Sequence, residues 1–237
     1  MHTFADYDFH PSLARALSEQ GYVEPTEVQA ESIDTAMAGK DLMVCSQTGS
    51  GKTLAYLLPV LNHLLKNRRL PHTGSRSLVL VPTRELAIQI FKLCGTLTKY
   101  SKLTSVLVTG GQESAYQASM LRKDPDVIIA TPGRLQQHIR ERAAELGDTE
   151  IAVLDEADRM LDMGFREEVM GIMATAPHPR QTLLVSATLS HRGIKDIADE
   201  LLVEPEQVTL STAKDAHEGI EHSIILADDP AHKTTLT

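Results

Sequence analysis

Short apolar runs rich in Val, Ile and Leu alternate with longer segments of helical spacing along most of the chain. The runs predict strands at residues 42–45, 77–81, 105–109, 126–130, 151–154, 182–185 and 207–210. The longer segments predict helices at residues 26–38, 52–66, 84–97, 113–122, 132–144, 165–174 and 192–202. Nearly continuous apolar strands separated by helices indicate an α/β fold, with a mostly parallel central sheet covered by helices on both faces. Ligands of such sheets bind at the carboxyl ends of the strands, so residues that directly follow strands are the first candidates for a site.

The composition fits one large α/β domain with an aliphatic core. Of the 237 residues, 42% are hydrophobic, only 4% are aromatic, and none is Trp. Cys45 and Cys94 have no metal-type spacing, which favours a reducing compartment. The amino terminus lacks the basic flank and apolar core of a signal peptide, and the longest apolar stretch, residues 54–65, is too short to span a bilayer. We therefore expect a soluble, cytoplasmic protein with no membrane partner.

The net charge of −9 argues against nonspecific binding of nucleic acid over the whole surface. It leaves room for a local groove, because affinity depends on the few phosphates that the protein neutralises. The basic cluster consists of Lys66, Asn67, Arg68 and Arg69. We interpret this cluster as a solvated helix end rather than a nucleic-acid contact.

A Gly-rich loop lies between the first predicted strand and the next helix, which is the context that a phosphate-binding loop requires. It comprises Ser46, Gln47, Thr48, Gly49, Ser50, Gly51, Lys52 and Thr53. Gly49 and Gly51 permit backbone angles that turn N–H groups toward phosphate oxygens, and the helix start adds its positive dipole end. Lys52 can then reach the β- and γ-phosphates of a nucleotide, and the Thr53 hydroxyl can bind Mg²⁺. Ser46 replaces the first Gly of the usual pattern, which is a mild departure.

The tetrapeptide of Asp155, Glu156, Ala157 and Asp158 follows the predicted strand at 151–154. Acidic residues there can simply favour a helix amino terminus. With a phosphate loop upstream, the functional interpretation is stronger: Asp155 holds Mg²⁺ through water, and Glu156 polarises the attacking water. The two segments together predict a nucleotide hydrolysis site.

Two further segments have both a structural and a functional interpretation. Thr26 and Gln29 fit a helix capping box, yet the Gln29 amide also has the geometry that reads adenine N6 and N7. Ser186 and Thr188 fit a helix cap, or else their hydroxyls bond the acidic loop and report hydrolysis to a bound polymer. The residues alone leave these alternatives open.

Taken in order, these segments resemble the first RecA-like domain of a DEAD-box RNA helicase. The resemblance rests on the segment ending at Gln29, residues 46–53, Pro82-Thr83-Arg84-Glu85-Leu86-Ala87, Gly110-Gly111, Thr131-Pro132-Gly133-Arg134, residues 155–158 and residues 186–188. These motifs span nearly the whole chain from Phe4 to Thr188, so chance agreement is negligible. One departure is Glu24, which stands where the family often has a basic residue.

The resemblance implies a role for residues that the pattern alone leaves ambiguous. Phe4 matches the upstream aromatic residue that packs on adenine, so the adenine-recognition segment covers residues 4–29. RNA backbone contacts are implied for Pro82, Thr83, Arg84, Gly110, Gly111, Thr131, Pro132, Gly133 and Arg134, and coupling roles for Asp158, Ser186 and Thr188. Such contacts to phosphates and 2′-hydroxyls tolerate any sequence and favour RNA over DNA. Without the resemblance, residues 82–85 could merely start a helix, and Gly110-Gly111 could be a turn.

The resemblance also implies a domain organisation. We expect a RecA-like ATP-binding domain at residues 1–210, a linker at 211–219 and the start of a second RecA-like domain at 220–237. The chain would then be a fragment, monomeric and weakly active, because the family's second domain supplies arginines that complete the ATP site. Such a residue contributes about 10³–10⁵ in rate.

The function implied is that of an ATP-dependent RNA helicase that uses ATP and Mg²⁺ to separate short duplexes. The compact amino terminus is typical of a bacterial member, whose full-length form we expect in ribosome-assembly or RNA-decay complexes. Two alternatives are a noncatalytic ATP-gated RNA clamp and a P-loop DNA translocase.

Overall fold

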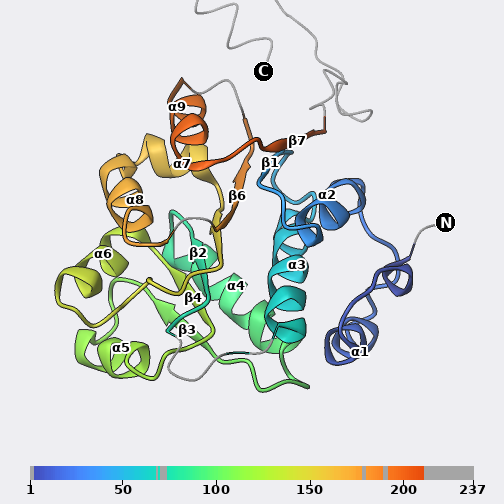
Figure 1. Cartoon of the computed structure of the whole chain (residues 1–237), viewed down its shortest axis with the longest axis horizontal. Coiled ribbons are helices and arrows are strands. Elements are labelled where there is room, and N and C mark those ends of the chain that lie inside the picture. The colour runs from blue at the N-terminus through green and yellow to red at the C-terminus, as the bar shows by residue number, and fades with distance from the viewer. Residues whose placement is uncertain (1–2, 68, 70–73, 178–179, 189–191, 211–237) are drawn as a thin grey trace, which may run out of the picture.

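The protein is built on one seven-stranded sheet in the order β3-β4-β2-β5-β6-β1-β7, and every pair of neighbouring strands is parallel (Figure 1). The structure is a computed structural model that describes residues 3–67, 69, 74–177, 180–188 and 192–210. The strands are β1 (Leu42–Cys45), β2 (Ser77–Leu80), β3 (Ser105–Val108), β4 (Val127–Ala130), β5 (Ile151–Leu154), β6 (Gln181–Ser186) and β7 (Glu206–Thr209). The predicted fold class is confirmed. The linker and second-domain start expected after residue 210 lie outside the described residues.

The helices follow the predicted alternation with the strands. They are η1, a 3₁₀ helix (Phe4–Asp6), α1 (Pro11–Glu19), α2 (Glu27–Met37), α3 (Lys52–Lys66), α4 (Arg84–Leu97), α5 (Ser114–Leu121), α6 (Pro132–Arg140), α7 (Ala157–Asp162), α8 (Arg166–Met173) and α9 (Arg192–Leu201). The pattern did not predict α1 or α7. Helix α7 has only six residues, too few for a hydrophobic period, and α1 begins where Pro11 follows the capping residue His10.

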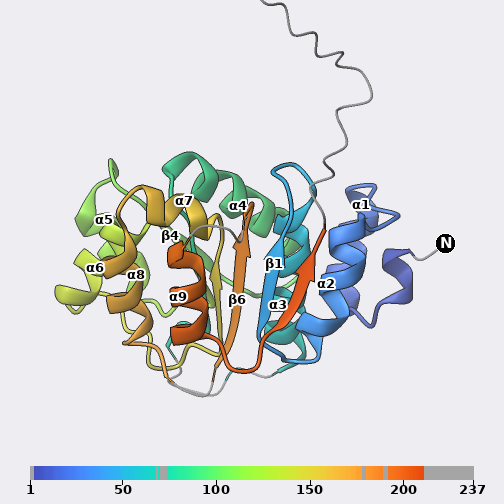
Figure 2. The ribbon, with the colours of Figure 1, turned by 90° about the horizontal axis from the view of Figure 1, so that it is seen from above.

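Two apolar cores cover the two faces of the sheet, because alternate strand residues point to opposite sides. On β5, Val153 belongs to the core under α1, α2, α3 and α4, whereas Leu154 belongs to the core under α5 to α9. Figure 2 shows the sheet between these two helical layers. All four residues of β2, β4 and β5 are buried, which explains why their sequences are apolar without alternation.

Helix α3 follows β1 after the Gly-rich loop and is buried along most of its length. None of the helices within the described ranges is long and apolar enough to cross a membrane.

Candidate functional site

The strand order divides the predicted motifs into two groups along the carboxyl edge of the sheet. The Gly-rich loop, the acidic tetrapeptide and the Ser186–Thr188 segment follow β1, β5 and β6, which are neighbours. The segments at 82–87, 110–111 and 131–134 follow β2, β3 and β4, which are also neighbours. We call these the nucleotide half and the RNA half, after the roles expected for their motifs. They meet where β2 pairs with β5.

The Gly-rich loop is folded around its own lysine. Gly49 and Gly51 have φ angles of 82° and 98°, in the left-handed region that favours glycine. The ammonium of Lys52, which is 8% exposed, donates to the carbonyl of Ser46 across the loop. Burial lowers the pKa of Lys52, and the charge of Asp155 opposes that shift. The loop thus holds a buried cation against one of its own carbonyls, at the place where a phosphate-binding loop needs positive charge.

Gln29 joins the capping box to this loop. Its side chain is 3% exposed, and its Oε1 accepts a hydrogen bond from the backbone N–H of Thr26 at 2.9 Å. Its Nε2 donates to the carbonyl of Gly51 at 3.0 Å. A Cβ at Gly51 would lie 2.5 Å from that nitrogen, so this approach needs glycine. The capping-box interpretation is confirmed, and the adenine contact stays a prediction.

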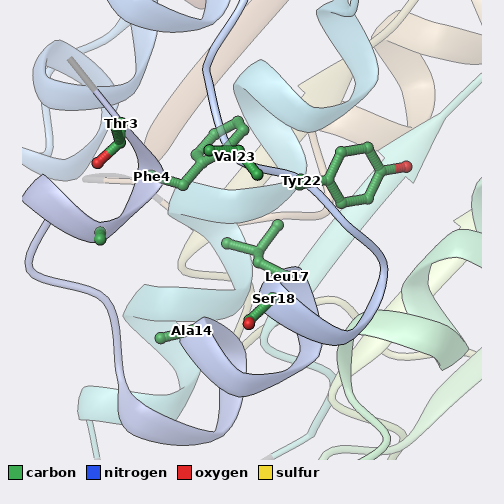
Figure 3. A pocket seen from close by; sticks show the side chains of 8 residues that line it. Thr3, Phe4, Ala14, Leu17, Ser18, Tyr22 and Val23 are labelled. Carbon is green, nitrogen blue, oxygen red and sulfur yellow. The ribbon is translucent and has the colours of Figure 1, made fainter. Parts of the chain in front are cut away.

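Phe4 lies beside the segment that leads to Gln29. Its backbone N–H donates to the carbonyl of Val23 at 2.9 Å, and its ring centroid is 6.4 Å from that of Tyr22, edge to face. The ring is 5% exposed and forms one wall of a mainly apolar cavity of about 280 Å³ between η1 and α1 (Figure 3). Leu17 and Ser18 of α1 line the opposite wall. The structure therefore places Phe4 against Tyr22 and Val23, a few residues before Thr26 and Gln29, and its contact with adenine stays a prediction.

Asp155 is the most perturbed carboxylate of the nucleotide half. It is 3% exposed, accepts a hydrogen bond from the Tyr56 hydroxyl at 2.9 Å, and accepts another from the backbone N–H of Glu156 at 2.9 Å. Burial raises the pKa of Asp155 to about 6, against the lowering effect of the Tyr56 bond. Burial raises the pKa of the Tyr56 hydroxyl and the Thr53 side chain lowers it, so Tyr56 lies between the Gly-rich loop and the acidic motif.

Glu156 has an unusual backbone. Its φ of 51° and ψ of 49° place a non-glycine residue in the left-handed region, a conformation that costs about 1–3 kcal/mol and persists where the surroundings impose it. Its carboxylate forms an ion pair with Arg159 at 3.0 Å. The left-handed turn at Glu156 sets the start of α7.

Asp158 links the acidic motif to the segment after β6. Its Oδ2 accepts hydrogen bonds from the backbone N–H groups of Ala187 and Thr188, each at 3.1 Å. The Ser186 hydroxyl donates instead to the Thr188 carbonyl at 2.7 Å. The two motifs are therefore in contact, and the backbone N–H groups of Ala187 and Thr188 make these two bonds.

In the RNA half, the three segments also touch one another. Thr83 caps α4, because its Oγ1 accepts from the N–H of Leu86 at 3.3 Å. The Arg84 guanidinium lies against Gly111, where an added Cβ would be 2.9 Å from its Cζ. Arg134 donates from Nη2 to the Gln112 carbonyl at 2.6 Å and from Nη1 to Gln137 Oε1 at 2.8 Å. Arg134 thus braces the loop after β3, in addition to any contact with a ligand.

The residues of the RNA half differ in their exposure to solvent. Arg84, Gly111 and Gly133 are exposed, Thr83, Gly110, Thr131 and Arg134 are intermediate, and Pro132 and Pro82 are buried. Pro132 occupies the first turn of α6, which suits its fixed φ. The two prolines therefore shape the segments, and the others are accessible to a polymer.

The comparisons with known proteins show the family of the chain. The family model of the DEAD/DEAH box helicase matches residues 26–197. The chain belongs to this family.

Among the curated relatives of this DEAD/DEAH box chain is the ATP-dependent RNA helicase SrmB of Escherichia coli. It is 40% identical over 234 residues, which cover 99% of the chain and 53% of the relative. The ATP-dependent RNA helicase DBP4 of Scheffersomyces stipitis is 39% identical over 213 residues, 90% of the chain and 28% of the relative. The chain thus spans about half or less of the length of these relatives.

The fold has a solved counterpart as well. The crystal structure of a DEAD box protein from the hyperthermophile Methanococcus jannaschii superposes with a TM-score of 0.80 at 29% identity, covering 87% of the chain and 55% of that protein. The RecA-like fold expected from the resemblance is confirmed.

In this DEAD/DEAH box domain, the basic cluster at residues 66–69 behaves as a solvated helix end. Lys66 pairs with Asp8 at 2.5 Å, and Arg69 pairs with Asp126 at 2.9 Å. Arg68 lies outside the described residues. The two described cations of the cluster are engaged within the protein, which favours the structural interpretation.

Three polar residues that support the site were not predicted from the sequence. Tyr56 lies four positions after Lys52 on α3, a spacing that puts both on one helix face and could have identified it. Gln117 and His138 are buried beneath the loop after β3. No local pattern distinguishes them from ordinary helix residues, because their partners are distant in sequence.

Proposed function

We propose that the chain is the first ATP-binding domain of an ATP-dependent RNA helicase, which binds ATP with Mg²⁺ in its nucleotide half and single-stranded RNA in its RNA half. The observation that carries the proposal is the strand order, which gathers three motifs of each kind on adjacent strands and makes the halves contiguous at β2 and β5. ATP hydrolysis at one half would then change the contacts of the other, as local unwinding of a duplex requires. The names of the curated relatives support an RNA helicase over the DNA translocase and the clamp.

The Gly-rich loop would hold the phosphates of ATP. Gly51 permits the close approach of the loop to Gln29, and buried Lys52 offers a cation whose present partner is a carbonyl that phosphate oxygens can replace. The proposed phosphate contacts are Ser46, Gln47, Thr48, Gly49, Ser50, Gly51, Lys52 and Thr53. Backbone N–H groups at the start of α3 contribute the rest of the attraction.

Thr53 and Asp155 fit the Mg²⁺ that accompanies ATP. The Asp155 carboxylate accepts from the Tyr56 hydroxyl at 2.9 Å, and the Thr53 side chain lowers the pKa of that hydroxyl, so a hydroxyl and a carboxylate both lie near Tyr56. No group of three or more His, Cys, Asp or Glu side chains within the described ranges could hold a metal alone. That agrees with Mg²⁺, which commonly binds through one or two protein groups plus substrate phosphates and water. When bound, the ion neutralises charge that develops between the β- and γ-phosphates.

Glu156 would orient and polarise the attacking water. Its backbone is left-handed at the start of α7, and its carboxylate lies 3.0 Å from the guanidinium of Arg159. The Glu156 carboxylate would accept the proton of the water as the bond from the water oxygen to the γ-phosphorus forms. The bond from that phosphorus to the β,γ-bridging oxygen would break at the same time, so that ADP and phosphate are released. Asp158 passes the resulting change to residues 186–188 through its two backbone hydrogen bonds.

Adenine would lie against Phe4 and Gln29. Gln29 uses one lone pair and one N–H within the protein, so its amide retains a second acceptor site and a second donor for a two-point contact. In the RNA half, the proposed backbone contacts are Pro82, Thr83, Arg84, Gly110, Gly111, Thr131, Pro132, Gly133 and Arg134.

The proposal is tested with two variants and two assays. Lys52→Ala in the 237-residue chain is expected to abolish binding of a fluorescent ATP analogue while leaving the circular dichroism spectrum unchanged. Glu156→Gln in the full-length protein is expected to preserve ATP binding and stop RNA-stimulated phosphate release. Unchanged turnover in Glu156→Gln would remove that residue from its role, and stimulation by DNA equal to that by RNA would favour a translocase.

The setting of the full-length protein extends the proposal. We propose residues 1–210 as the structural unit, the cytoplasm as its compartment, and ribosome-assembly or RNA-decay complexes as its surroundings; the family match supports RNA as the partner class. Co-sedimentation of the tagged full-length protein tests this proposal: the protein should appear in gradient fractions that contain ribosomal precursors rather than in fractions of free protein.

A further inference from the structure

A buried polar network lies directly beneath the loop of residues 110–113. It consists of Gln117 on α5 and His138 on α6, which are 1% and 0% exposed. Gln117 Nε2 donates to the Thr109 carbonyl at 2.8 Å and to Gln112 Oε1 at 3.2 Å. His138 Nε2 is 3.1 Å from Gln117 Oε1. The network therefore reaches from the interior of the domain to both ends of the loop.

The hydrogen-bond inventory fixes the direction of each bond. The Thr109 carbonyl can only accept, so the Gln117 nitrogen must face it, and the Gln117 oxygen must face His138. That oxygen can only accept as well, so the proton of neutral His138 lies on Nε2. Burial lowers the pKa of His138, and Arg134 and Arg122 add to the shift while Glu141 opposes it. The imidazole is thus held neutral as a single tautomer.

The same network converges on Arg134. The Thr109 carbonyl accepts a second, longer bond from Arg134 Nε at 3.4 Å, and Arg134 Nη2 holds the Gln112 carbonyl at 2.6 Å. His138 follows Arg134 by four residues on α6, so both point from one face of the helix toward the loop. The side chain of Gln112 is consequently hydrogen-bonded by Gln117, and its backbone carbonyl is hydrogen-bonded by Arg134.

We propose that Gln117 and His138 are positioning residues that hold the loop at 110–113 and Arg134 in the arrangement that contacts the RNA backbone. The inference rests on the proposed function, in which the RNA half binds the RNA backbone. Gly110 and Gly111 give this loop wide conformational freedom, and a site built on a free loop loses affinity to the cost of ordering it. Bonds from two rigid helices remove that cost before RNA arrives.

The test compares three variants with one control in the 237-residue chain. His138→Leu and Gln117→Met remove the network at similar volume, whereas His138→Gln keeps an N–H donor near the position of Nε2. Thr149→Val is the control, because Thr149 is 1% exposed and lies just before β5, at the amino ends of the strands and away from the loop. If His138→Leu does not fold, His138→Asn serves instead, since its shorter amide does not reach Gln117.

Two affinities are measured for each variant, one for a fluorescein-labelled oligouridylate by anisotropy and one for a fluorescent ATP analogue. We expect His138→Leu and Gln117→Met to bind the oligouridylate about tenfold more weakly, the effect of about one buried hydrogen bond. ATP-analogue affinity should not change, and His138→Gln should recover RNA binding. In the unchanged chain, imidazole ¹⁵N spectra should show the Nε2–H tautomer, and the amide signals of Gly111 and Gln112 should move only in the disrupted variants.

Each other outcome counts against a specific statement. Normal RNA binding by His138→Leu and Gln117→Met would overturn the inference and leave the proposed function standing. Equal losses of RNA and ATP-analogue affinity, or an equal loss in Thr149→Val, would mean general destabilisation and would also overturn it. If the unchanged chain binds no oligouridylate while it binds the ATP analogue, the proposed RNA half fails, and the positioning role for RNA fails with it.

Discussion

The Asp158 carboxylate accepts a hydrogen bond from the backbone N–H of Thr188 at 3.1 Å, across 30 residues of sequence. The same oxygen accepts from the N–H of Ala187. Because Asp158 follows β5 and Thr188 follows β6, this contact ties together the ends of two neighbouring strands. It is the direct connection between the acidic motif and the segment that we expect to report hydrolysis.

Asp158→Ala should therefore loosen the segment after β6. Asp158 is 9% exposed, and its removal breaks the bonds to the N–H groups of Ala187 and Thr188, although the Thr188 N–H keeps the Ser186 hydroxyl oxygen at 3.3 Å. We expect a loss of about 1–3 kcal/mol in the free energy of unfolding, because a charged acceptor is lost. Asp158→Asn keeps one carbonyl oxygen and should lose less. Urea unfolding of both variants measures the difference, and equal stability of Asp158→Ala and the unchanged chain would contradict the structural role.

Gly51→Ala should damage the nucleotide half more than Gly49→Ala. Both positions have left-handed φ angles, of 98° and 82°, and alanine there costs about 1–2 kcal/mol. A Cβ at Gly51 would also lie 2.5 Å from Gln29 Nε2, whereas none of the described atoms lies within 4 Å of one at Gly49. Thermal unfolding and ATP-analogue affinity check this, and a larger loss in Gly49→Ala would argue against the contact with Gln29.

Gly111→Ala should weaken RNA binding, because its Cβ would displace the Arg84 guanidinium, whose Cζ would be 2.9 Å away. We expect a loss of roughly tenfold, which corresponds to about 1.4 kcal/mol. The matched control is Gly110→Ala, since the space around that residue is open among the described atoms and its φ is ordinary. Anisotropy with labelled oligouridylate should separate the two, with ATP-analogue affinity unchanged in both.

Asp155→Asn should change how stability depends on pH. The pKa of Asp155 is about 6 in the folded chain, above its ordinary value of about 3.9, so the folded state binds more protons between these values. The free energy of unfolding therefore falls as pH rises from about 4 to about 6, and the cost remains at higher pH. The Asn variant lacks this titration.

The stability of Asp155→Asn relative to the unchanged chain should thus increase by about 1–3 kcal/mol between pH 4 and pH 7. Urea unfolding at several pH values measures the difference. Tyr56→Phe is a useful comparison, because loss of its bond to Asp155 should raise the pKa of that carboxyl further and shift the fall in stability to higher pH. A difference between Asp155→Asn and the unchanged chain that does not vary with pH would refute the raised pKa.

Several residues of the candidate site could be predicted from local sequence patterns. Lys52 and Thr53 could be recognised because the Gly-rich loop and the helix after it are contiguous in sequence, and Asp155 could be recognised because it ends a buried run. The partners of these residues could not. Tyr56 is 99 residues from Asp155, and the bond between them exists only because α3 packs beside β5. Similarly, the Ser186 hydroxyl bonds within its own segment, and backbone groups reach Asp158 instead.

By itself, the sequence determined that this is an α/β protein with its motifs at strand ends, because hydrophobic periodicity specifies the strands and the α-helices other than α1 and α7. It also determined the family, through motifs that are each read within a few residues. The tertiary structure alone decided the order of the strands, which places β2 beside β5 and makes the two halves adjacent. It also decided that Gln117 and His138 meet beneath the loop after β3. The physical reason is that these contacts depend on how whole elements pack together. The sequence pattern specifies only which face of each element is buried and which face is exposed to solvent.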